Sequence, residues 1–160
     1  MARYLAFLFV FLSSCKSLMH NDRLISYELI YPLDILIQTV GDFQEIQIDE
    51  RNSVRVMPAY FREWRGLENN IIVIISIDSN KLLADEPKVT SKIFGPMALY
   101  SLKTNTHKMT YTYSIDLKEV ELVARKNKIL ADTLSITVRN QTFQFSPKTI
   151  SKDRALEGLR

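Results

Sequence analysis

The chain has 160 residues, of which 46% are hydrophobic and 24% are charged, and its formal net charge is +3 at neutral pH. This composition allows one domain with its own apolar core and excludes a chain that is mainly disordered. The net charge is small and the two signs alternate along the chain, so a nucleic-acid partner is not expected.

The first fifteen residues have the layout of an export signal. Arg3 adds a positive charge near the amino terminus, and residues 4–12 form an uninterrupted apolar run. This run is shorter than the roughly 20 apolar residues that a transmembrane helix needs, and it is typical of a cleaved targeting segment. It ends in Leu12-Ser13-Ser14-Cys15, which contains the only cysteine of the chain.

This tetrad resembles the lipobox of bacterial lipoprotein signal peptides, in which an aliphatic residue and two small residues precede the cysteine. The resemblance implies that residues 1–14 are removed and that the Cys15 sulfur receives a diacylglyceryl group of the palmitate type. Residues 15–22 would then be a lipidated tether to the membrane. The alternative is an ordinary secreted protein with a chance cysteine near its start. A lipidated Cys15 leaves the mature domain without a thiol for a disulfide, a metal or a nucleophile.

The residue after the cysteine bears on location. Lys16 stands where inner-membrane lipoproteins of the enteric type have Asp. The resemblance therefore implies the outer membrane, with the periplasmic side favoured over the cell surface because no acidic pair follows Cys15. The rest of the chain is similar in style to small lipoproteins of Bacteroidetes, with no motif of a specific family.

Residues 23–150 are predicted to form a single β-rich domain, followed by a polar tail at 151–160. Alternation of apolar and polar residues predicts most of the strands. The expected strands are 24–31, 33–40, 44–48, 53–57, 71–77, 97–102 and 109–117, with a hairpin at 133–138 and 141–145. Pro58 is expected to end its strand, and Pro147 to close the hairpin. Residues 71–77 are apolar at nearly every position, which predicts a central strand covered on both faces.

One helix is expected near 117–127. Asp116 and Glu119 have the spacing of a capping box, and basic residues gather at the far end. A strand at 119–125 is the competing interpretation. The predicted fold class is mainly β and antiparallel, as either a β-sandwich or an α+β sheet with the helix on one face.

Few residues offer catalytic or metal chemistry. His20 and His107 are the only histidines and lie far apart in the sequence, so neither a zinc site nor a Ser-His-acid triad is expected, and no cofactor is expected either. A glycoside hydrolase would need only two carboxyl groups at a suitable separation. The available carboxylates are Asp34, Asp42, Glu45, Asp49, Glu50 and Asp116.

The most unusual local cluster lies at residues 60–66. It contains the only tryptophan of the chain, and aromatic and arginine side chains together are typical of binding surfaces. The candidate residues for binding a ligand or partner are Tyr60, Arg62, Trp64 and Arg65. Under this hypothesis Trp64→Ala weakens binding without unfolding the domain. The alternative is that the aromatic rings close one end of the core while the charged groups stay in water.

These observations favour a membrane-anchored, non-enzymatic binding or assembly module for a protein partner or a glycan. The alternative is a small cell-envelope hydrolase that acts on a glycan through a carboxylate pair. An inhibitor of the immunity type has the same sequence features as the binding module.

Overall fold

The computed structural model describes residues 22–33, 35–50, 52–78 and 86–149. The predicted signal peptide, Cys15, most of the tether and the polar tail lie outside these residues. The strands are β1 (Asp22–Tyr31), β2 (Ile37–Val40), β3 (Phe43–Asp49), β4 (Asn52–Trp64), β5 (Leu67–Asp78), β6 (Lys88–Ser91), β7 (Gly95–Pro96), β8 (Ala98–Thr104), β9 (Lys108–Asp116), β10 (Leu134–Val138) and β11 (Gln141–Thr149). The helix among the described residues is α2 (Leu122–Leu130).

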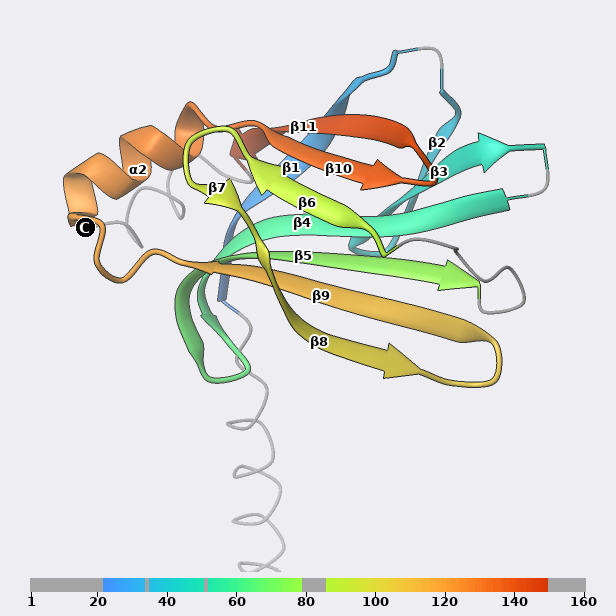
Figure 1. Cartoon of the computed structure of the whole chain (residues 1–160). Coiled ribbons are helices and arrows are strands. Elements are labelled where there is room, and N and C mark those ends of the chain that lie inside the picture. The colour runs from blue at the N-terminus through green and yellow to red at the C-terminus, as the bar shows by residue number, and fades with distance from the viewer. Residues whose placement is uncertain (1–21, 34, 51, 79–85, 150–160) are drawn as a thin grey trace, which may run out of the picture.

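The strands form one antiparallel sheet that is nearly closed into a barrel (Figure 1). The order is β7-β6-β10-β11-β1-β4-β5-β9-β8, and the β2–β3 hairpin joins it through β3, which pairs with β4. β7 and β8 stand at opposite ends of this order but follow each other in the chain. Between them, the Met97 N–H donates to the Val89 carbonyl of β6 at 2.9 Å, which holds the link between β7 and β8 against β6. The prediction of a mainly β, antiparallel fold is confirmed, with one curled sheet instead of two packed sheets.

The core has an inner and an outer part. Alternate residues of β4 and β5 point into the barrel, among them Val54, Val56, Ile71 and Ile75, which are fully buried. The residues between them build a second cluster on the outer face: Met57, Ala59, Phe61, Trp64 and Ile72. β5 lies between β4 and β9 and is buried on both faces, so the prediction of a central strand at 71–77 is confirmed.

Two prolines lie inside strands that they were expected to end. Pro58 is part of β4, opposite Val73, and Pro147 is part of β11, opposite Tyr27. Each proline lies where one edge of its strand lacks a neighbour: the β1–β4 ladder ends at Ala59 and the β10–β11 ladder ends at Phe145. A strand tolerates proline at such an edge because the missing N–H has no acceptor to serve. Both expectations were therefore wrong.

The helix starts later than predicted. Asp116 does not cap it: its carboxylate accepts the Lys118 N–H at 2.9 Å in a turn, and the N-cap residue is Glu121. The buried Arg125 guanidinium donates to the carbonyls of Lys118 and Val120, which holds residues 118–120 as a non-helical linker. The prediction of a helix in this region is confirmed, but the predicted start of the helix is wrong. The competing strand is absent from the described structure.

Candidate functional site

The predicted binding residues at 60–65 do not form one surface in the structure. Tyr60 points into the barrel and is 1% exposed, and its hydroxyl donates to the Asn69 side-chain oxygen at 3.0 Å. Burial raises the pKa of Tyr60, and the nearby Arg125 guanidinium opposes this rise. Trp64 lies in the outer cluster and is 3% exposed. Tyr60 and Trp64 thus contribute to two separate parts of the core.

The two arginines of this segment are on the surface. Arg62 forms an ion pair with Asp22 at the start of β1. Arg65 occupies the turn between β4 and β5 with φ of 47°, followed by Gly66 at 83°. Its guanidinium carbon lies 4.9 Å from the centre of the Trp64 ring, a cation–π contact that covers the ring. The face of Trp64 that could bind a ligand is therefore already occupied by Arg65.

A cleft opens instead where β1 leaves β4. The β1–β4 ladder pairs Ile25 with Tyr60 and Ser26 with Ala59, and then stops. Continuing this register would place Tyr27 opposite Pro58, which has no N–H to donate to the Tyr27 carbonyl. From this point β1 keeps β11 on one edge, while β3 takes its place beside β4. The sequence signal for the cleft is thus a proline within a long strand.

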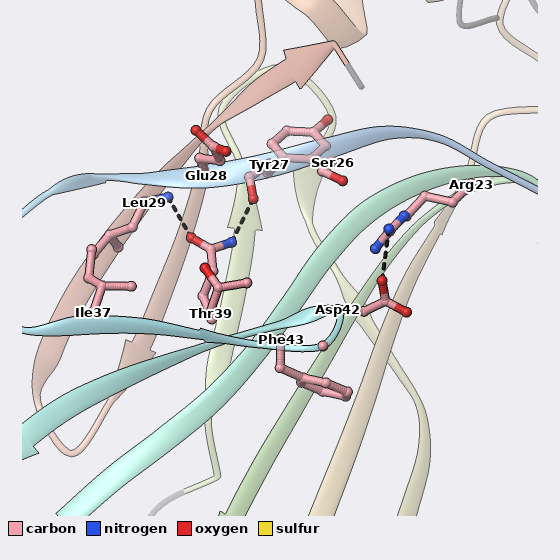
Figure 2. Close-up of a pocket in the computed structure, with 11 residues that line it drawn as sticks. Arg23, Ser26, Tyr27, Glu28, Leu29, Ile37, Thr39, Asp42 and Phe43 are labelled. Carbon is pink, nitrogen blue, oxygen red and sulfur yellow. Dashed lines mark hydrogen bonds and ion pairs between the residues drawn. The ribbon is translucent and has the colours of Figure 1, made fainter. Parts of the chain in front are cut away.

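The side chain of Gln44 on β3 bridges the opening. Its amide nitrogen donates to the Tyr27 carbonyl at 2.7 Å, and its amide oxygen accepts the Leu29 N–H at 2.9 Å (Figure 2). A side-chain amide thus serves the same donor and acceptor that a neighbouring strand would serve. We refer to the opening between β1 and the β2–β3 hairpin as the β1–β3 cleft.

The β1–β3 cleft has a volume of about 350 Å³ and mixed walls. Leu29 of β1 and Ile37 of β2 supply apolar surface, and Ser26 and Thr39 supply hydroxyl groups. At one end Arg23 and Asp42 form an ion pair at 2.8 Å, which Figure 2 shows beside the turn that leads into Phe43.

Beyond the cleft-lining Leu29 and Ile37, the chain between β1 and β2 carries exposed apolar side chains. Leu33 is 89% exposed and Leu36 is 75% exposed, and both lie in the connection from β1 to β2. Tyr31 and Ile37, which flank this connection, are also exposed. These four residues are called the apolar tip below. Single exposed apolar residues are ordinary, but a local group of large ones is typical of an interaction surface.

A second cleft, of about 260 Å³, lies on the outer face where β3, β4, β5 and β9 meet. It contains His107, Glu45 and Arg55. Glu45 accepts hydrogen bonds from the Ser53 hydroxyl at 2.7 Å and from Arg55 at 3.1 Å. The Ser53 bond is the main cause that lowers the pKa of Glu45, and Arg55 adds to it. Glu45 and Arg55 of this cleft are thus paired with each other.

The other candidate carboxylates are dispersed. Asp49 lies 3.7 Å from Arg139, while Asp42 and Asp116 make the contacts given above; Asp34 lies outside the described residues. Within the described ranges, no group of three or more His, Cys, Asp or Glu residues is arranged to hold a metal ion. No helix in the described part of the chain has the length and apolarity needed to cross a membrane.

One buried polar cluster was not anticipated from the sequence. Asp132, in the link from α2 to β10, is 2% exposed and accepts hydrogen bonds from the Ser91 hydroxyl and from the Ile93 N–H at 3.1 Å. Burial raises the pKa of Asp132, and these hydrogen bonds only partly offset the rise. Its negative charge also adds to the effect of burial in raising the pKa of Tyr27. The cluster fixes the β6–β7 turn and is closed to a ligand.

Compared with models of protein families, with curated proteins and with solved structures, the chain gives no match. Its function is therefore inferred from its own residues.

Proposed function

We propose that the mature chain is a lipid-anchored, non-enzymatic binding module whose protein partner docks on the apolar tip and the β1–β3 cleft. The observation that carries this proposal is the exposure of Leu33 and Leu36, two aliphatic side chains that are 89% and 75% open to water in the connection between two strands that line the cleft. Covering one such side chain contributes about 1.5–3 kcal/mol.

The chemistry of the tip favours a protein over a glycan. A sugar is recognised through many hydrogen bonds together with an aromatic platform, but the most exposed side chains here are aliphatic. The only tryptophan, which would be the best platform, is buried under Arg65. A hydrolase is not proposed, because the Asp132 carboxyl, whose pKa is raised, is buried, and Asp42, Glu45 and Asp49 are each paired with an arginine.

The expected anchor places this surface away from the membrane. β1 runs from Asp22 to the apolar tip at the opposite end of the molecule (Figure 1), and its ten residues span about 33 Å. The seven residue-to-residue steps from Cys15 to Asp22 reach at most about 25 Å. With β1 upright, the tip thus faces the aqueous space and meets a partner there.

The anchor is tested by labelling cells with a fatty-acid analogue. We expect the wild-type chain to take up the label and Cys15→Ser to remain unlabelled and to keep residues 1–14, because a thiol is needed for the lipid transfer. An equally labelled Cys15→Ser variant, or an unlabelled wild type, would contradict lipid anchoring.

The docking surface is tested by cross-linking in cells. A photo-reactive benzoylphenylalanine at Leu33 is expected to give one discrete adduct after irradiation, since this side chain would be covered by the partner. The same group at Leu102, an exposed residue of β8, is the matched control and should give no such adduct. Leu33→Asp with Leu36→Asp should abolish partner binding while changing the free energy of unfolding by no more than about 0.5 kcal/mol. The absence of an adduct at Leu33, or the same adduct at both sites, would overturn the proposal.

A further inference from the structure

In the β1–β3 cleft, the edge of β1 bonds to a side chain where a neighbouring strand would normally pair. From Ile25 to Tyr31 the strand pairs with β11 on its other edge, but after Ser26 no strand of the described chain pairs with it on the cleft side. The Gln44 side-chain amide instead satisfies the Tyr27 carbonyl and the Leu29 N–H. These two groups are among those that a neighbouring strand would bond.

The space next to this edge fits extended chain. One residue of a strand occupies about 160 Å³, from a rise of about 3.3 Å, a strand spacing of about 4.8 Å and a sheet thickness of about 10 Å. The cleft volume of about 350 Å³ therefore holds about two residues. Chain that continues from them past Leu29 and Ile37 would pass over the apolar tip.

The charges of the cleft favour an uncharged occupant. Arg23 is paired with Asp42, and Glu28 is paired with Lys148 of β11. An uncharged segment leaves both pairs intact, whereas a buried charge in the occupant would have no counter-ion. The walls at Leu29 and Ile37 are apolar, and those at Ser26 and Thr39 are short and polar. Small polar and β-branched residues match these walls.

We propose, on the basis of the proposed function, that the partner inserts an uncharged extended segment into the β1–β3 cleft and pairs with β1 by strand addition. The segment displaces the Gln44 side chain and takes over its two hydrogen bonds, to the Tyr27 carbonyl and the Leu29 N–H. Apolar residues next to the inserted part cover Leu33 and Leu36. Gln44 acts as an internal competitor that keeps the β1 edge satisfied until the partner arrives.

The test uses peptides selected from a random twelve-residue display library against the whole mature chain. The selected peptide is then compared with a copy that is N-methylated at alternate residues, which keeps the side chains but removes strand donors. We expect N-methylation in one of the two registers to weaken binding at least tenfold, because the β1 edge loses a hydrogen bond that leaves a buried group unsatisfied. Bound peptide should also slow amide hydrogen exchange at Leu29.

Two variants test the role of Gln44. Gln44→Ala removes the competitor and is expected to tighten peptide binding about tenfold. Gln47→Ala is the matched control on the same strand, since its amide donates to the Asp49 carbonyl of β3 and does not line the cleft, and it should leave the affinity unchanged. The Leu29 exchange measurement on the wild type needs neither variant and stands even if Gln44→Ala fails to fold.

The inference is overturned if no peptide is selected, if both N-methylated registers bind as well as the parent, or if exchange at Leu29 is unchanged. A partner that cross-links at Leu33 but does not slow amide exchange at Leu29 would exclude strand addition. The proposed binding function would remain. A missing adduct at Leu33 would instead remove the proposed function itself.

Discussion

Replacing Trp64 with alanine is expected to lower the free energy of unfolding by about 3–5 kcal/mol. Trp64 is buried in the outer cluster, with its ring centre 6.2 Å from those of both Phe61 and Tyr100. Its removal leaves a cavity between β4, β5 and β8 and uncovers the stacked Arg65. Urea denaturation of the variant and the wild type, monitored by circular dichroism, measures the difference.

The matched control for Trp64→Ala is Arg62→Ala in the same strand. Arg62 is exposed and its ion pair with Asp22 is on the surface, so the expected change is below about 1 kcal/mol. A Trp64→Ala variant as stable as Arg62→Ala would show that the tryptophan is not part of the core. The earlier hypothesis, that this substitution weakens binding and leaves folding intact, would then regain support.

Asp132→Ala is expected to destabilise the domain by about 2–4 kcal/mol. The substitution leaves the Ser91 hydroxyl and the Ile93 N–H without their carboxylate acceptor in a buried site. Asp132→Asn keeps an acceptor oxygen, so its loss of unfolding free energy should be less than half that of Asp132→Ala. Equal stability of Asp132→Ala and the wild type in denaturant titrations would contradict the assigned role.

The raised pKa of Asp132 also gives this group a defined dependence on pH. Because its pKa is higher in the folded than in the unfolded chain, its contribution is most favourable below the ordinary carboxyl pKa and is lost as the pH rises through the folded value. The stability of the wild type relative to Asp132→Asn should therefore fall as the pH is raised from acid and then level off. A relative stability that rises over the same range would show that the carboxylate is held by its hydrogen bonds more strongly than it is penalised by burial.

Much of the fold follows from alternation in the sequence. The strand at 109–117, the apolar strand at 71–77 and the tight turn at Arg139 and Asn140, with φ of 51° and 63°, are where the pattern placed them. Local signals failed where a distant neighbour decides the outcome. Pro58 does not end β4 because β1 departs at that point, and the start of α2 is delayed by a buried arginine that binds the preceding loop.

The predicted site at 60–65 failed to form one surface for a similar reason. Aromatic and arginine residues in one segment are equally suited to a binding surface and to a covered core, and only the packing of Tyr100 and Arg65 on Trp64 distinguishes the two. The β1–β3 cleft depends on a contact between Gln44 and β1, which local sequence patterns do not reveal. The sequence shows leucines at 33 and 36, but it does not show that they are exposed.

The central claim is that the apolar tip is covered by a partner in the cell. Hydrogen–deuterium exchange of residues 29–40, compared between the purified chain and the chain in its native membranes, tests this claim most directly. We expect slower exchange over 29–40 in native membranes, with unchanged exchange over α2 as the internal reference. Identical exchange of 29–40 in the two preparations would contradict a docked partner.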